Sequence, residues 1–121
     1  MSNITCTFLK MKNIIQLYHW QTKSFSRHKA SDELLSNLST KIDSFIETMQ
    51  GLYNNRVHIS GKTNMELYNY NDEQIIAVLE IFKKWLQEDV QLLFSKNTDL
   101  LNIRDDMLID INKTLYLFTF S

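Results

Sequence analysis

Residues 18–47, YHWQTKSFSRHKASDELLSNLSTKIDSFIE, join the end of one amphipathic helical pattern to the start of the next. In the second half of this stretch, leucine, isoleucine and phenylalanine recur every three or four residues, which is the period of an α-helix. The same stretch carries two histidines and three acidic residues that could bind a metal: His19, His28, Asp32, Asp43 and Glu47. Both the fold and the candidate chemistry are therefore predicted from it.

The last four of these residues predict one face of one helix. They are spaced 4, 11 and 4 apart, which places them at roughly 0°, 40°, 60° and 100° around a helix axis. Asp32 and Asp43 are about 16 Å apart along that axis, so no single ion can touch both within one chain. A second copy rotated about a two-fold axis would bring its Asp43 and Glu47 opposite His28 and Asp32. The spacing predicts a site that dimerisation completes.

Four apolar stripes at helical period run along the chain. They predict helices over about 5–22, 26–53 and 72–95, and a fourth after a tight turn at 96–98. The periodicity fades over 54–71, and a connection of that length inside a compact domain usually has a structural or functional role. Short, long and short connections predict an all-α, ferritin-like four-helix bundle with one long crossover between the second and third helices. Residues 1–121 are expected to form a single domain.

The beginning of the second helix has two candidate caps. Ser26 is one, whereas Ser31-Asp32-Glu33 is the stronger N-terminal signal, because a capping serine and two acidic residues favour the first turn. If Ser31 is the cap, His28 precedes the helix and leaves the shared face.

The composition indicates a soluble intracellular protein. Two glycines and no proline argue against a β-rich fold, and the single Cys6 suits a reducing compartment. The sequence shows neither a signal peptide nor an apolar run of about 18 residues. A net charge of −1 and the absence of a basic arm argue against DNA as a partner. The Asn/Ile/Lys-rich composition suggests an AT-rich genome, so we expect bacterial cytoplasm, or host cytoplasm or virion if the source is viral.

The polar positions follow the order of a known signature: His19-Trp20-x-x-Lys23, Phe25-x-x-His28-x-x-x-Asp32 and Asp43-x-x-x-Glu47. This order resembles that of the mini-ferritins, the DNA-binding proteins from starved cells (Dps). Residues 110–117 also resemble the last helix of that family, in which a lysine precedes an apolar and aromatic run. The chain departs from the family in the hairpin. The two histidines are nine residues apart, three fewer than is usual, and the family's Lys-Gly step is a Lys-Ser step here.

The resemblance implies a protein that oxidises Fe²⁺ with peroxide or oxygen and stores the ferric product inside a hollow homo-oligomer, a dodecameric shell in that family. One subunit would supply His19, His28 and Asp32, and its two-fold mate would supply Asp43 and Glu47. Imidazole and carboxylate ligands suit iron. Because the hairpin is short, we expect His19 to be the first partner of the mate's carboxylates, with His28 and Asp32 forming a weaker second position.

A second interpretation is a non-catalytic ferritin-like module with a structural or interaction role. Taken singly, i,i+4 pairs such as His28/Asp32 and Asp43/Glu47 are most often solvated surface. No glutamate has a histidine three residues later, which disfavours a di-iron centre inside one bundle. His58 is expected to be an ordinary polar residue of the long connection.

Overall fold

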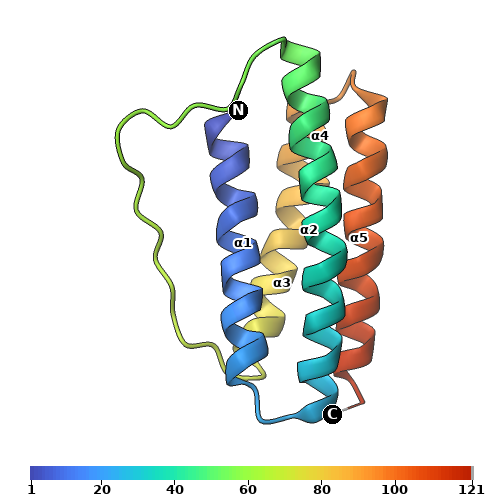
Figure 1. Ribbon diagram of the computed structural model, residues 1–121. Coiled ribbons are helices and arrows are strands. Elements are labelled where there is room, and N and C mark those ends of the chain that lie inside the picture. Colours follow the sequence, from blue (N-terminus) through green and yellow to red (C-terminus); the bar gives the residue numbers. More distant parts are fainter. Residues whose placement is uncertain (121) are drawn as a thin grey trace.

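The computed structural model of the protein describes residues 1–120, and over these residues the fold is helical throughout, without a β-strand. Four long helical stretches stand side by side (Figure 1). The first, second and fourth stretches are α1 (Ser2–Gln21), α2 (Phe25–Tyr53) and α5 (Thr98–Phe118). The third stretch is continuous but has three parts: α3 (Gln74–Trp85), the π-helical segment η1 (Leu86–Val90) and α4 (Gln91–Leu93). The prediction of an all-α fold is confirmed.

The connections between these stretches are short, long and short. Residues 22–24 join α1 to α2, residues 54–73 join α2 to α3, and residues 94–97 join α4 to α5. The long connection runs beside α1 from one end of the helices to the other, so α2 and α3 run in the same direction (Figure 1). Among the helices of residues 1–120, none combines the length and the apolar composition needed to span a membrane.

The second helix begins at Phe25, earlier than either predicted cap. Ser24 is the N-cap, and its hydroxyl accepts a hydrogen bond from the backbone N–H of Arg27 at 3.3 Å. Both candidate caps, Ser26 and Ser31, are therefore wrong. Ser31 lies in the second turn, where its hydroxyl donates to the backbone oxygen of His28 instead.

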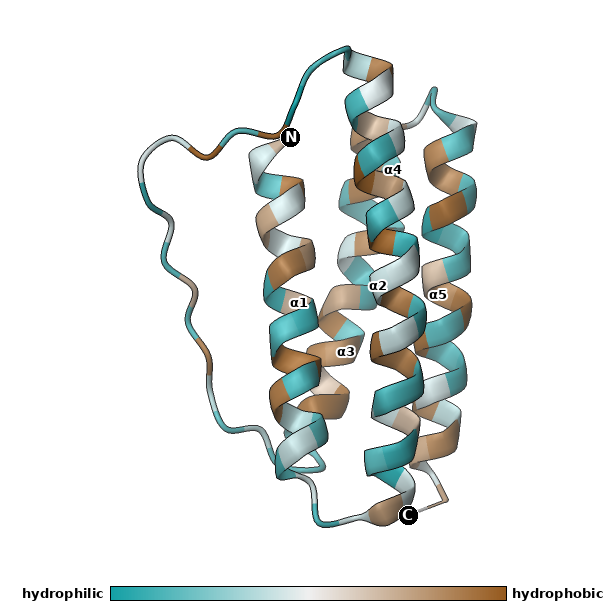
Figure 2. Cartoon of the chain, in the orientation of Figure 1, coloured by the Kyte–Doolittle hydropathy of each residue, from teal (hydrophilic) through white to brown (hydrophobic). Residues whose placement is uncertain are grey.

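The core is formed by the apolar stripes of all four stretches. Phe8 of α1 packs edge-on against Phe45 of α2 and against Phe82 and Trp85 of α3, at ring-centroid distances of 5.2, 6.3 and 5.3 Å. Aromatic pairs in this geometry contribute more than their buried area alone. Around each helix apolar and polar residues alternate, whereas the long connection is mostly polar (Figure 2). The helices are therefore held together by one shared apolar interior.

A buried guanidinium ties the bundle together at the end where α1 meets α2. Arg27 is 8% exposed. It donates to the hydroxyl of Tyr18 at 3.2 Å, to the backbone oxygen of Asp72 and to that of Phe118, and its Cζ lies 4.6 Å from the centroid of the Phe118 ring. Four parts of the chain thus converge on one side chain: α1, α2, the end of the long connection and α5.

The long connection is fastened to α1 mainly through side chains. Asn13 donates to the sulfur of Met65 and Gln21 donates to the side-chain oxygen of Asn69, at 3.0 and 2.7 Å. Within the described part of the chain, residues 56–70 form no backbone–backbone hydrogen bond. The backbone of this segment therefore lacks the hydrogen-bond ladder that protects the helices from proteolysis.

We expect trypsin to cut the native protein first after Arg56 and Lys62, both of which are exposed in this connection. Because the core contacts lie in the helices, the two large fragments, 1–56 and 63–121, should stay associated and elute together in gel filtration, whereas the peptide 57–62 is released. Mass spectrometry of a time course gives the order of the cuts. First cuts after Lys41 or Lys83, inside helices, would contradict this description of the connection.

Candidate metal-binding half-site at the α1–α2 hairpin

Two histidines face each other across the hairpin that joins α1 to α2. His19 lies in the last turn of α1 and His28 in the first turn of α2. Their rings stack with centroids 4.0 Å apart and planes inclined by 17°. The shortened hairpin thus brings the two residues into contact. We call them the histidine pair.

The histidine pair is held by reciprocal hydrogen bonds to the backbone. Nδ1 of His19 lies 2.7 Å from the backbone oxygen of His28, and Nδ1 of His28 lies 2.9 Å from the backbone oxygen of His19. A carbonyl oxygen can only accept, so each Nδ1 must carry the proton. In the neutral rings both Nε2 atoms therefore keep a free lone pair. Histidines that bind metals through one nitrogen commonly donate the other N–H to such a carbonyl.

Asp32 is the third candidate metal ligand that one chain supplies near the hairpin. Its Oδ1 lies 3.8 Å from Nε2 of His19, and the two side chains are 73% and 10% exposed respectively. With bonds of about 2.1 Å to nitrogen and to oxygen, as for zinc, one ion between these atoms would subtend an angle of roughly 130°. Octahedral or tetrahedral angles need about 3.0–3.4 Å between the two atoms, so the 3.8 Å separation would have to shorten for one ion to bind both His19 and Asp32. We call His19, His28 and Asp32 the half-site.

The stacking limits how the two rings can be used. A metal binds imidazole close to the ring plane, and here the two planes are nearly parallel with centroids 4.0 Å apart. Lone pairs lying in such planes do not converge on one point. The ring of His28 therefore does not bind the ion that His19 and Asp32 would share, which differs from the expected pairing of His28 with Asp32. Accordingly, no three His, Cys, Asp or Glu side chains within residues 1–120 gather closely enough to hold a metal ion.

The other two predicted ligands lie farther along α2. Asp43 and Glu47 are exposed on the outer side of the helix, at helical positions that share a face with Asp32. The chain does not bring them to the histidine pair, because they lie eleven and fifteen residues beyond Asp32 on the same helix. His58 is exposed in the long connection, in keeping with its expected role as a polar loop residue.

Two residues behind the half-site were not predicted. Ser31, 1% exposed, lies 3.1 Å from Nδ1 of His19 through its Oγ. Tyr18 precedes His19 and donates from its hydroxyl to Oδ1 of Asp72 at 2.6 Å. Burial and this hydrogen bond raise the pKa of the Tyr18 phenol, so it stays a donor. Ser31 is in phase with Leu34 and Leu38 of the apolar stripe, but the two acidic residues that follow it also resemble a helix cap.

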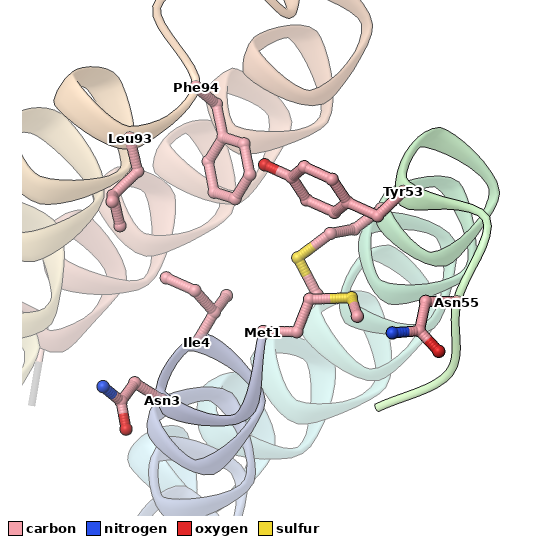
Figure 3. A pocket seen from close by; sticks show the side chains of 8 residues that line it. Met1, Asn3, Ile4, Tyr53, Asn55, Leu93 and Phe94 are labelled. Atoms are coloured by element: carbon pink, nitrogen blue, oxygen red, sulfur yellow. The ribbon is translucent and has the colours of Figure 1, made fainter. Parts of the chain in front are cut away.

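A separate cavity lies at the opposite end of the bundle. It has a volume of about 470 Å³ and is lined by residues of α1, α2, α4 and the adjoining turns (Figure 3): Met1, Asn3, Ile4, Met49, Tyr53, Asn55, Leu93 and Phe94. This lining has no imidazole, thiol or carboxylate, so the cavity does not suit the hard or borderline metals that the half-site suits.

Comparison with known proteins gives one match. No curated protein and no solved structure matches the chain. A family model, described as a family of unknown function (DUF5856), matches residues 19–118. The matched span begins at His19 and covers the half-site, α2 and the helices that follow it. The chain therefore belongs to this family of unknown function (DUF5856).

Proposed function

We propose that the protein binds Fe²⁺ between two subunits and accelerates its oxidation. The observation that supports this most is the half-site itself. Two imidazoles are fixed with Nδ1 protonated and Nε2 free, and one Nε2 lies 3.8 Å from a carboxylate oxygen. Mixed imidazole and carboxylate ligands are those that non-haem iron prefers.

A second copy of the chain would complete each site. In this proposal Asp43 and Glu47 of a two-fold mate face the half-site and add the negative charge that one carboxylate cannot supply. The outer surfaces of α1 and α2 carry exposed apolar side chains suited to such a contact. Leu9, Trp20 and Phe25 are 45, 70 and 72% exposed, and exposed apolar groups of this size commonly mark interfaces. Leu9 and Trp20, about three turns apart, share one side of α1.

In the reaction we propose, iron is the substrate. Two Fe²⁺ ions each give up one electron to hydrogen peroxide, which takes up two protons and leaves as two molecules of water. The protein residues change neither charge nor bonding overall. Carboxylates favour the step because the product ion carries more positive charge and prefers oxygen ligands. Oxygen is the alternative oxidant. Enclosing the site between subunits would keep the reacting ions apart from bulk water.

Storage of the ferric product follows from the same proposal. The parallel course of α2 and α3, joined by a long connection, supports a ferritin-like bundle with one crossover, and such bundles resemble the subunits of mini-ferritin shells. We propose a hollow homo-oligomer, dodecameric by that resemblance, acting inside the cell without DNA or a membrane as partner.

Mixing two inactive variants tests the split site. His19→Ala breaks the half-site, and Glu47→Gln breaks the contribution of the mate, so each variant alone should oxidise Fe²⁺ no faster than buffer. When equal amounts are unfolded and refolded together, about a quarter of the sites should contain no substitution, because mixed dimers hold one intact site and one doubly altered site. Peroxide-dependent oxidation should return to about that fraction of the parental rate.

The matched control mixes Asp43→Asn with Glu47→Gln. Both changes affect the same side of the site, so every site in the mixture carries one of them and no activity should return. If the test mixture recovers no more activity than the control mixture, the site does not lie between subunits.

A second function is favoured by one specific observation. The backbone oxygen of His19 is among the last carbonyls of α1, which have no partner within the helix. The ring of His28 donates to it at 2.9 Å. The histidine pair therefore also acts as a clamp that joins two helix ends, which suits a non-catalytic structural or interaction module. If this second function is correct, the parent protein does not accelerate iron oxidation, and His28→Ala lowers its melting temperature.

A further inference from the structure

Ser31 lies directly behind the histidine pair, on the core-facing side of α2. It is 1% exposed. Its hydroxyl donates to the backbone oxygen of His28 at 3.1 Å, and its Oγ lies 3.1 Å from Nδ1 of His19. A buried hydroxyl is costly unless it is hydrogen-bonded. Both hydrogen bonds that the structure gives to this side chain involve the histidine pair.

The ring of His19 can occupy its space in two orientations that differ by a half-turn about the Cβ–Cγ bond. In the observed orientation the Nδ1–H group faces two acceptors, the backbone oxygen of His28 at 2.7 Å and Oγ of Ser31. A half-turn would put a carbon in the place of Nδ1. Both oxygens would then lose the hydrogen bond from His19, and Nε2 would move away from Asp32.

We propose that Ser31 is a positioning residue, whose hydroxyl holds the His19 ring in the orientation that turns Nε2 toward Asp32. Its consequence for iron rests on the proposed function. The orientation of the His19 ring does not depend on the proposed function, because it can be measured in the metal-free protein.

The first test is nitrogen-15 NMR of the imidazoles in the metal-free protein, at a pH where the rings are neutral. In the parent, His19 should be the Nδ1–H tautomer almost entirely. In Ser31→Ala, one of two acceptors of that proton is lost, so the population of the Nε2–H tautomer should rise roughly fivefold. Ser44, an exposed serine of α2, provides the matched control, and Ser44→Ala should leave the His19 signals unchanged.

The second test is the affinity for Fe²⁺, measured without oxygen by isothermal titration. Partners that orient a ligand commonly contribute about 10- to 100-fold in metal affinity, so we expect a loss of about 10-fold in Ser31→Ala and none in Ser44→Ala. Ser31→Cys, which keeps the size and a weak donor, should lie between Ser31→Ala and the parent. It also provides a folded variant if Ser31→Ala proves unstable by circular dichroism.

The outcomes separate the two proposals. If the His19 tautomer in Ser31→Ala is the same as in the parent, the positioning role is wrong whatever the iron data show. If Ser31→Ala does not fold, the same comparison is made with Ser31→Cys. If the tautomer shifts while the parent binds no Fe²⁺, Ser31 positions His19 but the proposed function fails. A shifted tautomer together with a weakened Fe²⁺ affinity supports both.

Discussion

Replacement of Glu47 by glutamine is expected to abolish rapid Fe²⁺ oxidation while the protein remains folded. Glutamine keeps the size of the side chain but removes the negative charge that offsets the iron ion. Groups that merely orient metal ligands contribute about 10- to 100-fold, so the loss of a charged ligand should slow oxidation by about 100-fold or more. Because Glu47 is exposed on α2, the helix content and the melting temperature should hardly change. Stopped-flow absorbance after peroxide addition measures the rate.

Two variants control for this result. Glu33→Gln removes an exposed carboxylate of α2 that lies outside the predicted ligand set, and His58→Ala removes the histidine of the long connection. Both should oxidise iron at the parental rate. If Glu47→Gln is as fast as the parent, the assignment of this residue to the site is wrong. If Glu33→Gln is as slow as Glu47→Gln, the effect is one of general surface charge.

The largest expected loss of stability follows from Arg27→Ala. The substitution removes a buried guanidinium and leaves the backbone oxygens of Asp72 and Phe118 without its hydrogen bonds. Deleting one member of a buried polar network typically costs about 2–4 kcal/mol. For a domain of this size, that corresponds to a fall of about 10 °C in the melting temperature. Urea unfolding followed by circular dichroism measures the free energy of unfolding directly.

Arg56→Ala is the matched control for Arg27→Ala. Arg56 is exposed in the long connection, so the free energy of unfolding should change by about 0.5 kcal/mol or less. If Arg27→Ala is equally mild, the contacts of Arg27 are not what holds α1, the long connection and α5 together at this end of the bundle.

Apolar periodicity was sufficient to predict the helices. The stripes placed every helix bound within three residues of the observed one, because burial of one face decides helix position in a bundle. The ends of the stripes were less reliable. Leu52 and Leu93 continue the apolar stripes of their helices, but they are 45 and 59% exposed. Both lie near the ends of helices, where no neighbouring helix covers the stripe.

The contacts of buried polar side chains could not be predicted from the sequence. Arg104 is 7% exposed and donates to the backbone oxygen of Leu86 in η1 and to Gln91. Asp110 is similarly buried and pairs with Lys41 of α2. Such residues look like surface charges in a periodic pattern, because their partners come from other helices. The same limit applied to Ser31, whose sequence context resembled a helix cap.

The half-site was predicted in its members but not in its geometry. His19, His28 and Asp32 were singled out from spacing and from resemblance, and they do meet at the hairpin. Their reciprocal backbone hydrogen bonds and stacked rings depend on the path of residues 22–24, which spacing alone does not specify. Where Asp43 and Glu47 of another subunit lie is a property of the assembly, so a single chain leaves it as a proposal.

The most direct measurement is an anaerobic titration of the parent protein with Fe²⁺, followed by addition of peroxide and recording of ultraviolet absorbance. We expect binding to saturate at about two ions per chain, because in the proposed arrangement each two-fold dimer would have two sites with two metal positions each. Peroxide should then produce an immediate rise in ferric absorbance, with one peroxide consumed for about two ions, as the two-electron reduction requires. An absorbance rise no faster than that of Fe²⁺ in buffer, without saturable binding, would contradict the proposed function.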